Sequence, residues 1–175
     1  MKLDFTLKTY KTILEKFSGK GYTFQTLQEF SLKPASPRVV IVRHDVDRTP
    51  NNGIKMALIE NSLGIKASYY FRIVNESYDE NAIKKIIDLG HELGYHYEDL
   101  SLCNGNKEMA YNEFLKNLEN FRKFYPVKTI CMHGSPMSEF DNRLLWKTYD
   151  YKTSGIISEP YFDLDFDKKI GRAHV

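Results

Sequence analysis

Short apolar segments alternate with longer amphipathic segments along most of the chain, which is the pattern of an α/β protein. Four short segments rich in β-branched or aromatic residues predict strands: Val39–Val42, Ala67–Phe71, Leu93–His96 and Val127–Met132. Between them, apolar residues recur at helical spacing in the segments 50–63, 79–89 and 106–125. The alternation predicts a parallel sheet covered by helices, either an open doubly wound sheet or a (β/α) barrel.

The two ends of the chain depart from this alternation. Residues 6–18 have helical spacing and are followed by a polar and aromatic stretch, so we interpret 1–37 as a helical extension and linker. Near the other end, Asp141 is expected to cap a short helix, and the segments Gly155–Ile157 and Tyr161–Phe166 are expected to be extended. The uniformly apolar run Val39–Val42 is typical of a strand buried on both faces.

The composition is that of one soluble globular domain. The chain has 175 residues, of which 42% are hydrophobic and 27% charged, so disorder, collagen and coiled coil are excluded. A net charge of +2 without a basic block gives no reason to expect a nucleic-acid partner. No apolar run approaches the roughly 20 residues of a membrane span, and the start of the chain has no signal-like segment, so we expect a cytoplasmic protein. Cys103 and Cys131 lie in unrelated surroundings and are expected to be reduced thiols.

Two aspartates follow the first predicted strand of the sheet. Asp45 and Asp47 are two residues apart, so in an extended chain their side chains point to the same side, at the strand end where α/β folds place their sites. Two close carboxylates repel each other unless a cation or a proton lies between them. The pair therefore predicts a metal site or an acid/base pair; the alternative is two solvated acids neutralised by Arg43 and Arg48.

Two histidines end the third and fourth predicted strands. His96 and His133 are thus expected at the same edge of the sheet as the two aspartates, where both could be imidazole ligands of a metal. Gly134 would let the backbone approach a ligand closely. Three strand ends that each deliver a His or an Asp favour one shared site.

Neighbouring polar residues have weaker signals. Glu98 or Asp99 could complete a metal shell or orient His96, and the alternative is a solvated start of the next loop. His91 precedes its strand, so we expect it at the opposite edge as a helix-end or surface histidine. Cys131 lies inside a strand without a paired base, so we do not expect a nucleophile there.

Together these motifs resemble the polysaccharide deacetylase family, also called the NodB-homology or carbohydrate esterase 4 group, in the branch whose first motif reads HDVD. The resemblance covers about Arg38–Ile157 and depends on the segments Arg43–Asp47, Gly90–His96 and His133–Pro136. Members of the family have a distorted (β/α) barrel and hydrolyse N- or O-acetyl groups on sugars, usually with zinc or another divalent ion. The resemblance therefore implies a hydrolase that acts on an acetylated carbohydrate or a related small amide.

The resemblance also implies roles for individual residues. Asp45 stands in the place of the catalytic base, and Asp47 and His96 stand in the places of metal ligands, with Zn²⁺ as the expected ion. Such an ion would lower the pKa of a water molecule and polarise the acetyl carbonyl, while Asp45 takes the proton of the water. The expected substrate-binding residues are Arg43, His44, Tyr97 and Gly134.

The chain departs from the family at two points. Leu100 stands where the family has the second histidine of its metal motif, and leucine cannot bind a metal. Either Glu98 or His133 then supplies the third ligand, or the ion is weakly held, or this branch has lost it. The general-acid histidine of the family lies near the end of the barrel, a region not recognised here, so the resemblance leaves open whether the polypeptide as given is active or inactive.

The length predicts an incomplete barrel. A full (β/α) barrel needs about 200 residues or more, and the barrel assigned here covers only 38–169. The last six residues, Ile170–Val175, match one reading frame of a common sequencing adapter. We therefore hypothesise that 170–175 is a non-native tail and that the natural chain continues beyond Lys169.

Three other functions compete with this interpretation. The segment Asp45–Thr49 fits the Asp-x-Asp-x-Thr opening of haloacid-dehalogenase-type phosphatases, with Asp45 as nucleophile and Asp47 as acid. That chemistry does not require His96 or His133, and the downstream lysine and paired acids are not found. A glycosyltransferase with a metal-bound sugar nucleotide has weaker support. A degenerate barrel that binds a glycan without cleaving it is the alternative that is not an enzyme. The pattern gives no oligomeric state.

Overall fold

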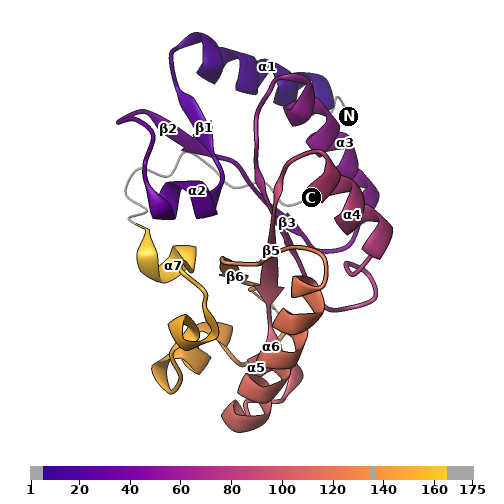
Figure 1. The fold of residues 1–175 in the computed structure, drawn as a ribbon. Coiled ribbons are helices and arrows are strands. Elements are labelled where there is room, and N and C mark those ends of the chain that lie inside the picture. Colours follow the sequence, from indigo (N-terminus) through magenta and orange to yellow (C-terminus); the bar gives the residue numbers. More distant parts are fainter. Residues whose placement is uncertain (1–5, 135–136, 165–175) are drawn as a thin grey trace.

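The computed structural model describes residues 6–134 and 137–164 (Figure 1). The hypothesised tail 170–175 lies outside the described residues. A four-stranded parallel sheet with strand order β3-β4-β5-β6 forms the centre of the molecule. Its strands are β3 (Arg43–Val46), β4 (Ser68–Phe71), β5 (Glu92–Tyr97) and β6 (Ile130–Met132). The predicted α/β class is confirmed, with four parallel strands in a curled sheet, whereas the incomplete barrel of the deacetylase type remains a prediction.

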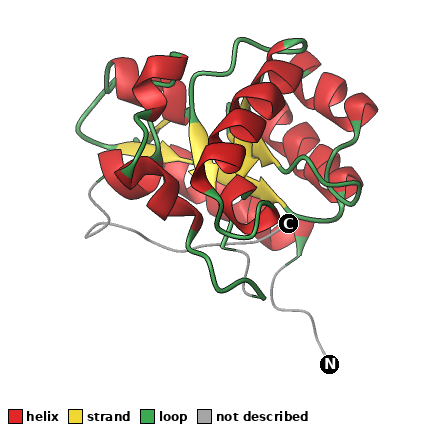
Figure 2. Ribbon diagram, turned by 90° about the horizontal axis from the view of Figure 1, so that it is seen from below, coloured by secondary structure: helices red, strands yellow, loops and turns green. Residues whose placement is uncertain are grey.

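Helices connect the strands and cover the outer face of the sheet, as the view from below shows (Figure 2). They are α3 (Pro50–Ser62), α4 (Glu80–Asp88), α5 (Asp99–Leu102) and α6 (Lys107–Arg122). Asp79 caps α4 and Asn106 caps α6 through bonds from backbone amides, so these two helices begin where polar cap residues satisfy their free N–H groups. Only the one-turn helix α5 was not expected.

Alternate residues of each strand point to opposite faces of the sheet. The outer face carries most of the core, in which aromatic side chains from β4 and β5 pack against α4 and α6. On the inner face, the Tyr70 ring lies so close to Gly94 that a Cβ there would be 2.2 Å from it. Gly94 therefore permits the tight packing of adjacent strands on the inner face.

The first strand of the sheet differs from the predicted one. Val39–Val42 was expected to be the buried strand, but β2 (Val39–Ile41) is only half-buried and pairs with β1 (Thr23–Gln25) in a separate two-stranded parallel sheet. The strand that enters the main sheet is β3, which consists of the motif residues themselves. An apolar run indicates burial but does not identify the partner strand. The prediction was therefore wrong: β3, the next strand along the chain, takes the place in the main sheet that was expected for Val39–Val42.

Residues 6–37 pack closely on the rest of the chain. The expected N-terminal helix is confirmed as α1 (Leu7–Gly19), whose Tyr10 and Leu14 pack with Met56 and Ile65. The segment interpreted as a linker also contains the short helix α2 (Leu27–Leu32), which begins with a Thr26–Glu29 capping box. This T-x-x-E pattern was present in the sequence and could have predicted the helix.

The last described segment is mostly short helices: η1 (Asn142–Lys147), η2 (Tyr151–Ser154) and α7 (Pro160–Asp163). The cap by Asp141 is confirmed, although η1 is a 3₁₀ helix. Gly155–Ile157 does not form a strand; a single bridge joins Thr129 and Ser158 nearby. The extended segment expected from Tyr161 is helical up to Asp163, because Pro160 starts a helix that Glu159 caps, and residues 165–166 lie outside the described part.

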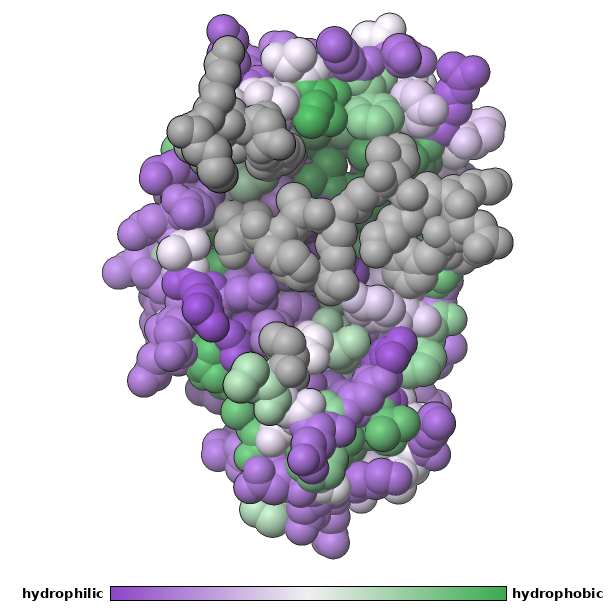
Figure 3. All heavy atoms as spheres, turned by 180° about the vertical axis from the view of Figure 1, so that it is seen from behind, coloured by the Kyte–Doolittle hydropathy of each residue, from purple (hydrophilic) through white to green (hydrophobic). Residues whose placement is uncertain are grey.

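The described surface is mixed in character. Figure 3 shows one face, on which hydrophilic side chains predominate and hydrophobic side chains gather in smaller groups. Among residues 6–134 and 137–164, no helix combines the length and the apolar character needed to cross a membrane. Both cysteines are free thiols, as expected, with Cys131 buried and Cys103 half-buried.

Candidate metal site

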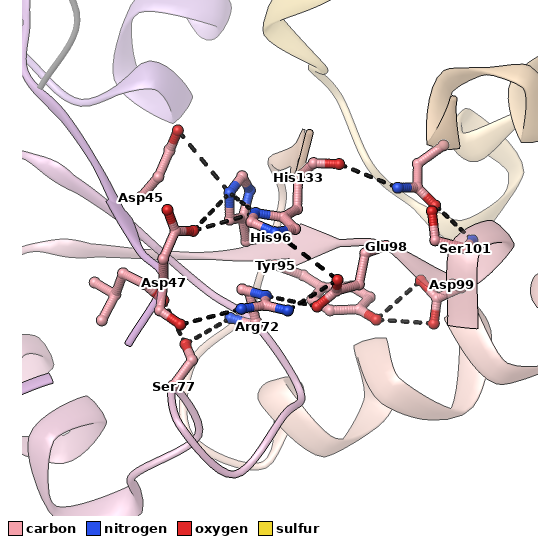
Figure 4. Close-up of polar contacts among 12 residues, drawn as sticks. Asp45, Asp47, Arg72, Ser77, Tyr95, His96, Glu98, Asp99, Ser101 and His133 are labelled. Atoms are coloured by element: carbon pink, nitrogen blue, oxygen red, sulfur yellow. Dashed lines mark hydrogen bonds and ion pairs between the residues drawn. The ribbon is translucent and has the colours of Figure 1, made fainter. Parts of the chain in front are cut away.

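Asp47, His96 and His133 come together at the carboxyl edge of the sheet (Figure 4). Asp47 follows β3, His96 lies in β5, and His133 follows β6. In a flat sheet β3 and β6 would lie about 14 Å apart, because neighbouring strands are spaced by about 4.8 Å. Here Asp47 Oδ1 lies 3.2 Å from His133 Nδ1, so the sheet curls and brings its first and last strands together.

The three ligand atoms form an almost equilateral triangle. His133 Nδ1 is 3.2 Å from His96 Nε2 and 3.2 Å from Asp47 Oδ1, and His96 Nε2 is 3.4 Å from the same oxygen. Nitrogen and oxygen ligands about 2.0 Å from a tetrahedral Zn²⁺ lie about 3.3 Å from one another. The three side chains therefore fit three corners of a tetrahedral site and leave one corner for water or substrate.

A hydrogen bond orients the His96 ring, and a carboxylate faces the far side of the His133 ring. His96 Nδ1 lies 2.9 Å from the Cys131 carbonyl oxygen, which can only accept, so we assign the proton to Nδ1 and leave Nε2 free to bind a cation. His133 turns its Nε2 toward a Glu98 oxygen at 3.9 Å and its Nδ1 toward Asp47. The ligand atoms thus point at one another because the opposite ring nitrogens face acceptors.

Glu98 faces the His133 ring on the side away from the triangle and is not placed as a ligand. Arg72 holds both of its oxygens, with Nε to Oε1 at 2.6 Å and NH2 to Oε2 at 2.9 Å. A third Arg72 nitrogen, NH1, donates to the backbone oxygen of Asp47 at 3.2 Å. Arg72 was not among the residues predicted from the sequence. It follows the end of β4 directly, so the strand-end argument used for the other three strands could have found it.

Charge is balanced differently on the two aspartates. Burial alone would raise the pKa of Asp47, but the contacts of its carboxylate with the His133 and His96 rings outweigh this effect and hold the pKa well below its usual value. Asp45 is 1% exposed and forms an ion pair with Arg43, whose NH2 lies 3.0 Å from Oδ2. The same oxygen is 4.0 Å from His96 Nε2, so Asp45 stands beside the triangle and not in it.

Two of the four predicted substrate-binding residues point away from this site. His44 points to the outer face, where Nε2 lies 2.6 Å from Glu60 Oε1. Tyr97 also points outward and packs against Phe114 and Trp146 in the core. Both alternate with residues of the inner face, so the pleat of the strand turns them away. Gly134 is exposed, and a Cβ there would meet no atom within 4 Å, so no protein neighbour requires glycine. Arg43 contacts a site residue through its side chain, in the ion pair with Asp45.

The remaining predicted residues lie at a distance from the triangle. Leu100, in place of a family histidine, is buried in the core at 2% exposure. Asp99 accepts hydrogen bonds from Tyr95 and Asn117, and burial raises its pKa to about 7. His91 lies at the opposite edge as expected, but it is buried and not on the surface: Ala67 N donates to its Nδ1 at 3.1 Å. Of the two alternatives for the third ligand, the geometry favours His133 over Glu98.

The fold and the site define an α/β protein with a candidate metal centre at the carboxyl edge of a curled parallel sheet. Comparisons of the chain with protein-family models, with curated proteins and with solved structures found no match. A functional interpretation therefore depends on the chemistry of the site and on the motif resemblance.

Proposed function

We propose that the protein is a metal-dependent hydrolase that removes the acetyl group from an N- or O-acetylated sugar or a related small amide. One observation carries the proposal: the atoms of Asp47, His96 and His133 converge on one point, and the Asp45 carboxylate lies beside that point. Hydrolysis by metal-activated water needs residues that bind the cation and a separate base close to the water molecule. The triangle and Asp45 supply these two parts.

Each residue has a distinct role in this proposal. Asp47, His96 and His133 would hold a divalent ion, most suitably Zn²⁺, and the bound ion would acidify water and polarise the acetyl carbonyl. Asp45 would take a proton from the attacking water. Arg43 fixes the orientation of Asp45 through their ion pair.

The bond changes are those of acyl transfer to water. The water oxygen adds to the acetyl carbon, one proton passes to Asp45, and the bond from that carbon to nitrogen or oxygen breaks. The products are acetate and the free amine or alcohol, whose leaving atom takes up a proton. Because Asp45 is buried and held by Arg43, its free movement is restricted, which keeps it close to the water it must deprotonate.

The phosphatase alternative has less support from the geometry. In that reaction Asp45 would attack phosphorus and Asp47 would act as the acid, with no need for imidazoles. Instead, two imidazole nitrogens lie 3.2 Å and 3.4 Å from Asp47 Oδ1, and the contacts with these two rings lower the pKa of this carboxyl group. A carboxyl group held ionised in this way is a poor proton donor.

Two product assays on the same protein test the proposal. The full chain, freed of metal and then supplied with Zn²⁺, Mn²⁺ or Mg²⁺, is incubated with acetylated amino sugars and separately with a generic phosphomonoester. We expect ion-dependent acetate release that a chelator abolishes and that Asp45→Asn lacks. Phosphate release with Mg²⁺ and no acetate would overturn the proposal in favour of the phosphatase.

A further inference from the structure

A second group of metal-ligating side chains lies deeper in the curled sheet. Asp45, His96 and Cys131 each offer a ligand atom, and the three atoms lie within 4.8 Å of one another. All three residues are buried, with exposures of 1%, 1% and 0%. The hydrolytic reaction proposed above gives Cys131 no role, so the thiol in this group needs a separate explanation.

The strand register explains why the thiol lies beside the imidazole. His96 and Cys131 are register partners on the parallel strands β5 and β6, so their side chains are neighbours on the inner face. The carbonyl oxygen of Cys131 also fixes the His96 ring through Nδ1. Asp45 approaches from β3 because the sheet curls, and its Oδ2 lies 4.0 Å from His96 Nε2.

The donor set differs from that of the triangle. Asp47, His96 and His133 supply oxygen and nitrogen, whereas Asp45, His96 and Cys131 supply oxygen, nitrogen and sulfur. Thiolate sulfur favours soft ions such as Zn²⁺ and Cd²⁺ over Mg²⁺ and Mn²⁺. Ligands of a tetrahedral Zn²⁺ with bonds of about 2.0–2.3 Å lie about 3.5 Å apart, so side-chain shifts of about 1 Å would close the deeper group around an ion.

Positive charge compensates the two acidic groups of the deeper site. The guanidinium of Arg43 lies 3.0 Å from Asp45. Burial alone would lower the pKa of Arg43, but the nearby Cys131 and Asp45 raise it above its ordinary value. The Arg43 guanidinium therefore places a positive charge beside both Cys131 and Asp45.

We propose that Asp45, His96 and Cys131 form a second position for a soft divalent cation, and that it is an alternative to the position formed by Asp47, His96 and His133. Both positions need His96 Nε2, since Nδ1 is bonded to a carbonyl oxygen, so only one of them is complete at a time. Binding at the deeper position forms a metal–sulfur bond and releases the thiol proton to solvent. The site itself does not depend on the proposed hydrolase activity; if that activity is correct, an ion there would also occupy its base, Asp45.

Cadmium is the sharpest probe, because a cadmium–thiolate bond gives a charge-transfer absorption band in the near ultraviolet. Cd²⁺ is added to the metal-free full chain, and we expect this band at an intensity of one thiolate for each bound ion, with no band for Mg²⁺ or Mn²⁺. Cys131→Ser is expected to lose the band. Cys103→Ser is the matched control, because it removes the other thiol of the chain, and it is expected to keep the band.

A crossed pair of variants separates the two positions. His133→Ala is expected to keep the cadmium band but to lose Mn²⁺ binding, measured by electron paramagnetic resonance, whereas Cys131→Ser is expected to keep Mn²⁺ binding. X-ray absorption of the Zn²⁺-loaded wild-type protein needs no variant and is expected to show a zinc–sulfur distance of about 2.3 Å. Absence of both the cadmium band and the zinc–sulfur distance in the wild type would overturn the second position, whatever the acetate assay shows. A band that persists in Cys131→Ser would overturn it as well.

Discussion

Two clusters of histidines and a carboxylate lie on opposite faces of the same sheet. On the inner face, His96 and His133 face Asp47. On the outer face, His44 and His91 face Glu60, with Nε2 of His44 2.6 Å and Nδ1 of His91 3.6 Å from its oxygens. The two clusters have the same composition, but their surroundings differ.

The outer cluster is closed. Tyr10 and Tyr69 donate to the two oxygens of Glu60, and the side chains of Glu60 and His91 are 0% exposed. His91 accepts from one backbone amide at Nδ1 and faces the Ala57 carbonyl oxygen through Nε2, so it is neutral, and burial lowers its pKa. Glu60 is therefore enclosed by side-chain partners, whereas Nδ1 of His44 is buried without a hydrogen-bond partner among the described residues.

The inner cluster is open on one side. The side chains of Asp47 and His133 are 22% and 14% exposed, and three ligand atoms point at one another. The contrast teaches that residue types alone do not define a metal site. Ligand atoms must face a common point that water can reach, and the remaining hydrogen-bonding groups must be directed elsewhere.

The largest expected effect separates the two aspartates of the inner face. We expect Asp47→Ala to lose both bound Mn²⁺ and turnover, because it removes a corner of the triangle and the thiol-containing position does not favour this ion. We expect Asp45→Asn to keep bound Mn²⁺ and to lower kcat by about 100- to 10,000-fold, because it removes only the base. Mn²⁺ content and acetate release are measured on both proteins. Asp88→Asn, an exposed aspartate on α4, is the control, and equal metal loss in Asp45→Asn and Asp47→Ala would contradict the two roles.

Removal of the carboxylate of the outer cluster should reduce stability and leave metal binding unchanged. Glu60→Ala would leave His44, Tyr10 and Tyr69 buried without their acceptor, so we expect the free energy of unfolding to fall by about 3–5 kcal/mol. Metal affinity of the folded protein should not change, because Glu60 lies on the other face of the sheet. Urea unfolding and metal titration provide the two measurements. Glu15→Ala, which breaks an exposed ion pair on α1, should cost about 0.5 kcal/mol or less, and a similarly small loss in Glu60→Ala would contradict the closed network.

The inner site was largely predictable, for a local reason. A residue at the carboxyl end of a parallel strand faces the edge where such sites lie, and this argument uses only the strand pattern; it found Asp45, Asp47, His96 and His133. The same pleat could have placed His44 and Tyr97 on the outer face, since each is adjacent in sequence to an inner-face residue.

Other features depend on contacts between distant segments. β2 pairs with β1, and Glu98 forms an ion pair with Arg72. In both cases the local sequence around one partner does not predict the other partner. The curl of the sheet, which brings His133 to Asp47, likewise results from packing on both faces. A single sequence shows which residues end strands, but the strand partners and the curvature of a sheet are determined by the packing of the whole chain.

Asp99 is another buried carboxyl group on the outer side of the sheet, and it should make the stability of the protein depend on pH. Its pKa is raised to about 7 by burial, against about 4 in an unfolded chain. The folded chain therefore keeps the proton between these values, and stability falls as the pH rises toward 7. We expect Asp99 to contribute a loss of about 2–3 kcal/mol between about pH 5 and pH 8. Urea unfolding at both pH values should show that Asp99→Asn reduces the loss.

Part of that pH dependence should remain in Asp99→Asn. Burial also raises the pKa of Glu159 to about 7, so this second carboxyl group adds a loss of the same sign. The control Asp88→Asn, which alters an exposed group, should show the wild-type dependence. An Asp99→Asn protein whose stability falls with pH as steeply as that of the wild type would show that Asp99 is ionised throughout this range in the folded chain.

The smallest expected effect concerns Glu98, which faces the His133 ring of the inner site. Glu98→Gln would remove the charge that faces His133 Nε2 and would break the two-point contact with Arg72. We expect metal affinity to fall by about 10- to 100-fold, the usual cost of losing a group that orients a metal ligand. The measurement is a competition titration of the metal-free protein with Mn²⁺ and a chelator, because the thiol-containing position does not favour Mn²⁺. Glu80→Gln, whose partner Lys84 is exposed, is the matched control and should bind as the wild type does. An unchanged affinity in Glu98→Gln would mean that Asp47 and the protein backbone alone orient His133. The contact of Glu98 with Arg72 would then make no contribution to metal binding.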